Sequence, residues 1–129
     1  MNARVLLDSH IALWAVAGNR RLSPQARQAI LAADEVYVST ATVWEIAIKH
    51  ALGKGDMPVA SGPALQAFRD AGYELLDVKP EHAVGVEDLP PIHRDPFDRL
   101  LVAQAMGEPL TLLTGDPVVM QYSTSIMRV

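Results

Sequence analysis

Short apolar runs alternate with helical segments along this 129-residue chain, and this alternation constrains its fold more than any other feature. The first run, Val5-Leu6-Leu7, ends at Asp8 and is typical of a strand buried on both faces of a parallel sheet. Neighbouring parallel strands need crossover connections, and helices supply them. The pattern therefore predicts an α/β fold with a mostly parallel sheet. Further strands are expected at residues 36–38, 73–78, 110–113 and 125–127.

The helical segments carry recognisable start and stop signals. Ser23-Pro24 offers an N-cap followed by a proline at the first helical position, and Asp95-Pro96 repeats the arrangement. Gly18 and Gly107 are expected to end the first and last helices. The breaker-rich stretch from Gly53 to Pro63 is expected to be a loop inside one domain that spans residues 1–129. Helices are expected at residues 11–16, 24–33, 40–52, 62–71, 81–87 and 96–106.

Composition narrows the class of protein. Half of the residues are apolar and about a fifth are charged, which is enough to build a core. The chain has no cysteine, so disulfides and thiolate metal sites are excluded. No secretory signal or membrane-spanning stretch is recognisable, so a soluble cytoplasmic protein is expected. A net charge of −4 argues against a simple nucleic-acid-binding module but is compatible with a nuclease whose acids hold cations.

Four acidic residues fall at comparable places in this pattern. Asp8 ends the first strand, and Glu45 lies in the first turns of the helix after the second strand. Asp98 lies in the first turn of the helix that Asp95-Pro96 opens, and Asp116 follows the fourth strand. Ligands of open parallel sheets bind beyond the carboxyl ends of the strands, where the following helices begin. The pattern thus allows all four carboxylates to meet in one cleft.

Each acid also has a purely structural interpretation. Asp8 and Asp116 suit helix N-caps, and the segments Thr42–Glu45 and Asp95–Asp98 match capping boxes. Four converged carboxylates, however, would repel one another, by roughly 3 kcal/mol for a pair 5 Å apart at an effective dielectric constant near 20. Such a cluster needs a counter-cation, and ligation by oxygen alone suits Mg²⁺ or Mn²⁺. Spacing along the chain leaves both interpretations open.

Four blocks of this sequence resemble the motifs of PIN-domain nucleases. Val5–His10 resembles their opening strand with its acid, and Ser39–Lys49 resembles their second motif. His93–Ala105 is similar to the third motif of one VapC-like toxin branch, and Leu113–Asp116 resembles the fourth. The blocks extend over essentially the whole chain, and the third is the most specific. The sequence departs from the family at Gly115-Asp116-Pro117, which is less typical around the fourth acid.

The resemblance implies a three-layer α/β/α domain with a parallel sheet of about five strands. It implies an endoribonuclease dependent on Mg²⁺ or Mn²⁺ that acts as the toxin of a type II toxin–antitoxin pair. It further implies homodimerisation, neutralisation by a cognate antitoxin, and binding of operator DNA only through that antitoxin. The site residues that carry over are the acids Asp8, Glu45, Asp98 and Asp116, with the hydroxyls of Ser9 and Thr114 as supporting groups.

Other polar residues receive structural interpretations. Asp95 is expected to cap the helix that begins at Pro96, and Lys49 is expected to pair with Glu45 four residues earlier. Arg99 is expected to form a structural ion pair, although a contact to an acid or a phosphate is the alternative. No histidine shows metal-ligand spacing, so structural or surface roles are expected for His10, His50, His82 and His93.

Two other functions remain open. A phospho-receiver-like domain shares the architecture but requires a lysine after a late strand, and no lysine follows Lys79. A binding module with the nuclease fold could dock an antitoxin without cutting RNA. The apolar segments 11–16 and 46–52 suit either a partner groove or ordinary core packing. Trp14 and Trp44 are expected in the core or at an interface, with base stacking as the alternative.

Overall fold

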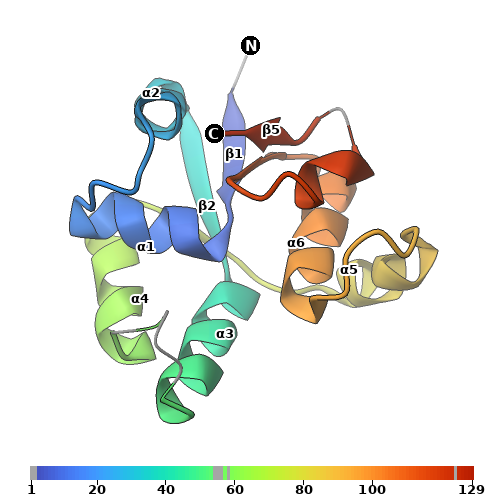
Figure 1. Cartoon of the computed structure of the whole chain (residues 1–129), viewed down its shortest axis with the longest axis horizontal. Helices are drawn as coiled ribbons and strands as arrows, with labels where there is room; N and C mark the ends of the chain where they lie inside the picture. The colour runs from blue at the N-terminus through green and yellow to red at the C-terminus, as the bar shows by residue number, and fades with distance from the viewer. Residues whose placement is uncertain (1–2, 54–56, 58, 124) are drawn as a thin grey trace.

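The computed structural model describes residues 3–53, 57, 59–123 and 125–129, and strands and helices alternate along them as predicted (Figure 1). The strands are β1 (Arg4–Leu7), β2 (Glu35–Ser39), β3 (Glu74–Leu76), β4 (Thr111–Thr114) and β5 (Met127–Arg128). The α-helices are α1 (Ser9–Ala17), α2 (Pro24–Ala32), α3 (Thr40–Ala51), α4 (Ser61–Asp70), α5 (Pro80–Gly85) and α6 (Pro96–Gly107). Two short 3₁₀ turns follow α5 and β4, η1 (Val86–Asp88) and η2 (Val119–Tyr122).

The described strands form one sheet with the order β3-β2-β1-β4-β5. Every neighbouring pair in this sheet is parallel. β1 lies at the centre, where Leu6 is paired with Tyr37 of β2 and with Leu112 of β4. The expected α/β fold with a parallel sheet of five strands is confirmed.

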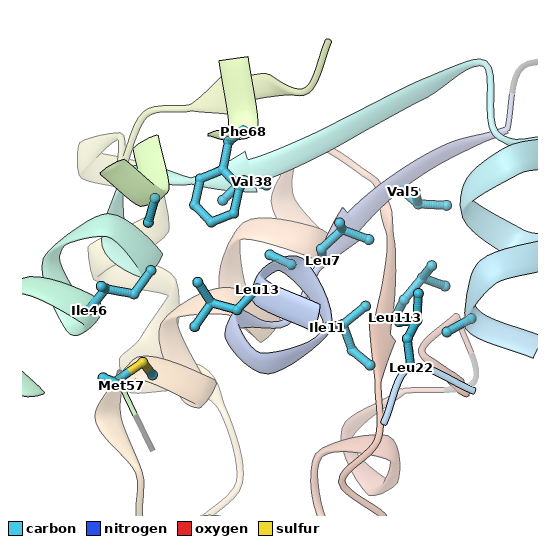
Figure 2. Close-up of a cluster of buried hydrophobic side chains, with 13 residues drawn as sticks. Val5, Leu7, Ile11, Leu13, Leu22, Val38, Ile46, Met57, Phe68 and Leu113 are labelled. Carbon is cyan, nitrogen blue, oxygen red and sulfur yellow. The ribbon is translucent and has the colours of Figure 1, made fainter. Parts of the chain in front are cut away.

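Side chains that alternate along the central strands fill two separate cores, one on each face of the sheet. Val5 and Leu7 point to the side covered by α1, α3 and α4, where Phe68 and Ile46 are fully buried (Figure 2). Leu6 points to the opposite side, where it packs against Leu101 and other residues of α6. This alternation explains why the strands are continuously apolar in sequence, since both of their faces are covered.

Local signals set most of the helix starts. The side chains of Ser23 and Asp95 accept hydrogen bonds from the first-turn N–H groups of α2 and α6, as predicted. Ser39 caps α3, so the expected capping box between Thr42 and Glu45 is wrong and Glu45 lies in the second turn of that helix. The buried strand β2 leads directly into α3, which leaves no room for a later helix start.

Some predicted boundaries shift. Gly107 is the last residue of α6 and not a residue beyond it, and the expected helix at 81–87 divides into α5 and η1. The predicted loop from Gly53 to Pro63 falls partly on residues 54–56 and 58, which lie outside the described residues. Its end is wrong, because α4 already begins at Ser61. Pro63 is tolerated there because N–H groups of a first helical turn have no acceptor within the helix. None of the described helices is long and apolar enough to cross a membrane.

The buried face of β1 gives a direct test of the fold. Leu6 is completely buried at the centre of the sheet, whereas Leu31 on α2 is 77% exposed. We expect Leu6→Ala to lower the free energy of unfolding by about 2–5 kcal/mol because it leaves a cavity in the core. The matched change Leu31→Ala should alter it by less than about 0.5 kcal/mol. Urea titration of both variants measures the difference, and similar losses in the two would contradict the described packing.

Candidate active site

The four predicted acids meet at one edge of the sheet. β1 and β4 are neighbours and end side by side, so Asp8 and Asp116 follow the same edge. Glu45 enters from α3 and Asp98 from the first turn of α6. All four line one pocket of about 570 Å³. The convergence that the sequence only allowed is therefore present in the structure, and Asp95 lines the same pocket.

Thr114 links the first acid to the fourth. Its hydroxyl donates to Asp8 Oδ2 over 2.9 Å and accepts a hydrogen bond from the backbone N–H of Asp116 over 3.0 Å. The other oxygen of Asp8, Oδ1, accepts from the backbone N–H of His10, so Asp8 also caps α1. Burial raises the pKa of Asp8 above its usual range, although the hydrogen bonds from Thr114 and His10 oppose this effect. The hydroxyl of Thr114 thus lies between the first and fourth acids.

Glu45 is buried, with 3% of its surface exposed, and both of its oxygens already have partners. Ser9 Oγ donates to Oε1 over 2.6 Å, and Lys49 Nζ donates to Oε2 over 2.7 Å. Ser9 in turn lies 3.2 Å from the hydroxyl of Thr42. The predicted pair of Lys49 with Glu45 is confirmed, and Ser9 stands beside the acids as expected. These contacts fix the carboxylate of Glu45 and compensate its charge.

Asp98 carries the least compensated charge of the cluster. Its side chain is 21% exposed, and the described residues place no lysine or arginine in an ion pair with it. Burial raises the pKa of Asp98 to about 7, and the negative charges of Asp8 and Asp95 add to this effect. At Asp116 burial also acts to raise the pKa, but hydrogen bonds from the Val118 backbone and from His93 outweigh it and lower the pKa.

His93, expected to be a structural or surface residue, contacts two of the acids, which its sequence context did not predict. Its Nε2 atom lies 3.0 Å from Asp116 Oδ2 and 3.3 Å from Asp98 Oδ2. The contact with Asp116 joins residues 23 positions apart, so spacing rules based on nearby ligands do not detect it. The available signal was the place of His93 at the start of the third motif. His82 and His50 have structural contacts, as expected, to Glu108 and to the carbonyl of Met57.

One further expectation needs correction, and the core half of another is wrong. Arg99 forms no ion pair among the described residues. Its guanidinium donates instead to the Tyr122 hydroxyl and to backbone carbonyls of Val86, Leu89, Pro90 and His93. Trp44 is not a core residue, because it is 61% exposed. It packs edge-on against Phe97, with 5.3 Å between the ring centroids. Trp44 directly precedes Glu45 in sequence, and Phe97 directly precedes Asp98. Trp14 is half-buried against the core, as expected.

Comparison with known proteins identifies the fold and the family. A model of the PIN-domain family matches residues 5–122. Ribonuclease VapC22 from Mycobacterium tuberculosis is 34% identical over 115 residues, which cover 87% of this chain and 86% of that protein.

Solved structures share the fold at low identity. VapBC2 from Rickettsia felis, bound to a DNA fragment from its promoter, matches with a TM-score of 0.67 and 15% identity, covering 97% of this chain and 96% of that one. A toxin–antitoxin complex from Klebsiella pneumoniae matches with a TM-score of 0.67 and 17% identity, covering 95% of each chain. These structures show the shared fold, and the family model and the relative from M. tuberculosis show that the chain belongs to the PIN-domain family and, within it, to the VapC-type ribonucleases.

Proposed function

We propose that this VapC-type ribonuclease hydrolyses RNA phosphodiester bonds internally with Mg²⁺ at the pocket lined by Asp8, Glu45, Asp98 and Asp116. PIN nucleases are metal-dependent enzymes. The observation that carries the proposal is the convergence of these four carboxylates on one pocket from separate elements of the fold. Mn²⁺ has the same preference for oxygen ligands and would substitute for Mg²⁺.

The donor set of the pocket fits a divalent cation. It offers carboxylate oxygens, which are the ligands that Mg²⁺ prefers, and the sequence contains no competing thiolate. Burial and the neighbouring charges of Asp8 and Asp95 raise the pKa of Asp98, and the described residues place no lysine or arginine in an ion pair with it. Asp8, Asp98 and Asp116 would hold the cation directly. Glu45 would act through a water molecule, because its charge is already paired with that of Lys49 at 2.7 Å.

The surrounding residues suit an anionic substrate. When bound, a divalent cation at such a site makes water a stronger nucleophile near neutral pH and stabilises the charge that develops on the leaving oxygen. Arg21 and Lys49 line the same pocket and offer positive charge to the phosphate backbone of RNA.

We further propose that the chain is a single domain over residues 1–129 that acts in the cytoplasm as the toxin of a toxin–antitoxin pair. An apolar groove of about 630 Å³ supports a protein partner. It lies between α1 and α4, with Leu13, Trp14 and Ala64 among its lining residues, and not between α1 and α3 as the sequence suggested. A cognate antitoxin would occupy it, and operator DNA would be bound only through that antitoxin. We also propose that the chain forms a homodimer.

Cleavage of RNA tests the assignment of the acids. We expect Asp98→Asn and Asp8→Asn each to reduce Mg²⁺-dependent cleavage of a structured RNA pool by on the order of 10²-fold or more. Asp70→Asn is the matched control, because Asp70 is exposed on α4 and bonds only to Gln66 among the described residues. Cleavage by wild type should stop when EDTA is added. Equal cleavage by wild type and Asp98→Asn would refute the site, and a fold that binds an antitoxin without cutting RNA would then be favoured.

The charge of the acid cluster should also lower the stability of the metal-free protein. The pKa of Asp98 is raised from 3.8 to about 7 in the folded state, so the folded state binds this proton more tightly than the unfolded state. Ionisation of Asp98 therefore destabilises the fold progressively as pH rises from 3.8 towards about 7. In EDTA at pH about 8, Asp98→Asn should be more stable than wild type by a few kcal/mol, since one pKa unit corresponds to about 1.4 kcal/mol.

Thermal unfolding at two pH values checks this expectation. The gain in Tm should nearly vanish near pH 4, where Asp98 is protonated in wild type as well. Added Mg²⁺ should raise the Tm of wild type more than that of Asp98→Asn. A gain of the same size at both pH values, or a loss of stability at pH about 8, would show that the carboxylate of Asp98 is not under electrostatic strain.

A further inference from the structure

The ring of His93 is held at both nitrogens inside the acid cluster. Nε2 lies 3.0 Å from Asp116 Oδ2 and 3.3 Å from Asp98 Oδ2. On the other side of the ring, the backbone N–H of Asp95 donates to Nδ1 over 3.0 Å. The residues that line the acid pocket include Asp98 and Asp116 but not His93.

These contacts determine which nitrogen carries the proton. A backbone N–H can only donate, so Nδ1 must accept with its lone pair. In a neutral imidazole with Nδ1 as the acceptor, the proton is on Nε2. That N–H then donates to Asp116 and lies against Asp98, which makes His93 a bridge between the third and fourth acids.

Direct ligation of a cation by His93 conflicts with this arrangement. Nε2 and one carboxylate oxygen from each of Asp98 and Asp116 lie within 4.8 Å of one another, a spacing that would suit three ligands of one ion. A ligating nitrogen, however, must present its lone pair to the metal. The proton would then have to move to Nδ1, where it would face the N–H of Asp95 at 3.0 Å with no acceptor between them.

The backbone of His93 is fixed by a second set of hydrogen bonds. The N–H of His93 donates to the Tyr122 hydroxyl over 2.7 Å. Arg99 Nη1 donates to the same hydroxyl over 3.1 Å and lies 3.4 Å from the carbonyl of His93. Arg99 belongs to α6, which also carries Asp98, and Tyr122 belongs to η2, which follows Asp116. The position of the His93 ring is therefore set by the same parts of the fold that position these two acids.

We propose that His93 is a positioning residue that holds the carboxylates of Asp98 and Asp116 in place by donating its Nε2–H, and that it does not ligate the metal. This inference rests on the proposed function in so far as the two carboxylates hold the cation. Hydrogen bonds to the ligands of a metal orient them, and their loss typically lowers metal affinity by about 10–100-fold.

Nitrogen NMR of the histidine side chains tests the tautomer directly. We expect His93 in the metal-free protein at neutral pH to carry its proton on Nε2, and addition of Mg²⁺ to leave that proton in place. A proton found on Nδ1, or on both nitrogens, would overturn the inference. Loss of the Nε2 proton when Mg²⁺ binds would overturn it as well, since it would make His93 a ligand.

Substitutions at position 93 test whether a hydrogen-bond donor is required there or whether any side chain suffices. The longer amide of His93→Gln can place an N–H where Nε2 stands, whereas the shorter amide of His93→Asn cannot. By calorimetric Mg²⁺ titration, His93→Asn and His93→Ala should bind about 10-fold more weakly or worse, and His93→Gln should retain most of the affinity. His50→Ala is the control, because His50 contacts the Met57 carbonyl and not the acids. Equal losses in the Gln and Asn variants, or wild-type affinity in the Ala variant, would contradict the proposal.

Failure of this inference differs from failure of the proposed function. If wild type binds neither Mg²⁺ nor Mn²⁺, the proposed function fails, and the tautomer in the metal-free protein decides the role of His93 separately. If wild type binds Mg²⁺ and cuts RNA while His93→Ala does both equally well, the function stands and the positioning role is refuted.

Discussion

The hydrogen bond from Thr114 to Asp8 joins the ends of the neighbouring strands β4 and β1. The rest of the site depends on the register in which these two strands pair. Leu7 is paired with Leu113, and the backbone N–H of Asp8 extends the ladder by donating to the Leu113 carbonyl over 3.0 Å. Because successive strand residues face opposite sides of a sheet, a slip of one residue would turn Thr114 away from Asp8. The apolar residues of both cores prevent such a slip, so hydrophobic packing fixes the positions of charged groups that it does not touch.

Hydrogen-bond donors are distributed unevenly among the acids, and this explains where a cation is needed. Asp8 accepts from Thr114 and His10, and Glu45 accepts from Ser9 and Lys49. Asp98, by contrast, has only the contact with His93 among the described residues. Burial raises its pKa to about 7, and the charges of Asp8 and Asp95 add to this effect. The protein thus compensates Asp8, Glu45 and Asp116 internally, and Asp98 is the acid whose charge the proposed cation would compensate.

Features that depend on residues close in sequence were predictable from the sequence. The succession of strands, acids and helices along the chain follows from the short apolar runs. The caps at Ser23 and Asp95 follow from residues within one helical turn. Features that depend on contacts between residues far apart in sequence were not predictable. Arg99 bonds carbonyls up to 13 positions earlier, and His93 reaches Asp116 across 23 positions, so neither contact leaves a local pattern. The exposed place of Trp44 likewise depends on which face of α3 the sheet covers.

Capping and metal binding, which the sequence presents as alternatives for Asp8, are compatible in the structure. Oδ1 accepts the first-turn N–H of α1, while Oδ2 is bonded to Thr114, and the carboxylate lines the pocket. Each carboxylate oxygen has two lone pairs, so a cap on one oxygen leaves capacity for a cation. The cap in fact orients the carboxylate before any cation arrives. The same residue types that begin helices after parallel strands are therefore already placed for a cation site, because strand ends and helix starts share one edge of the sheet.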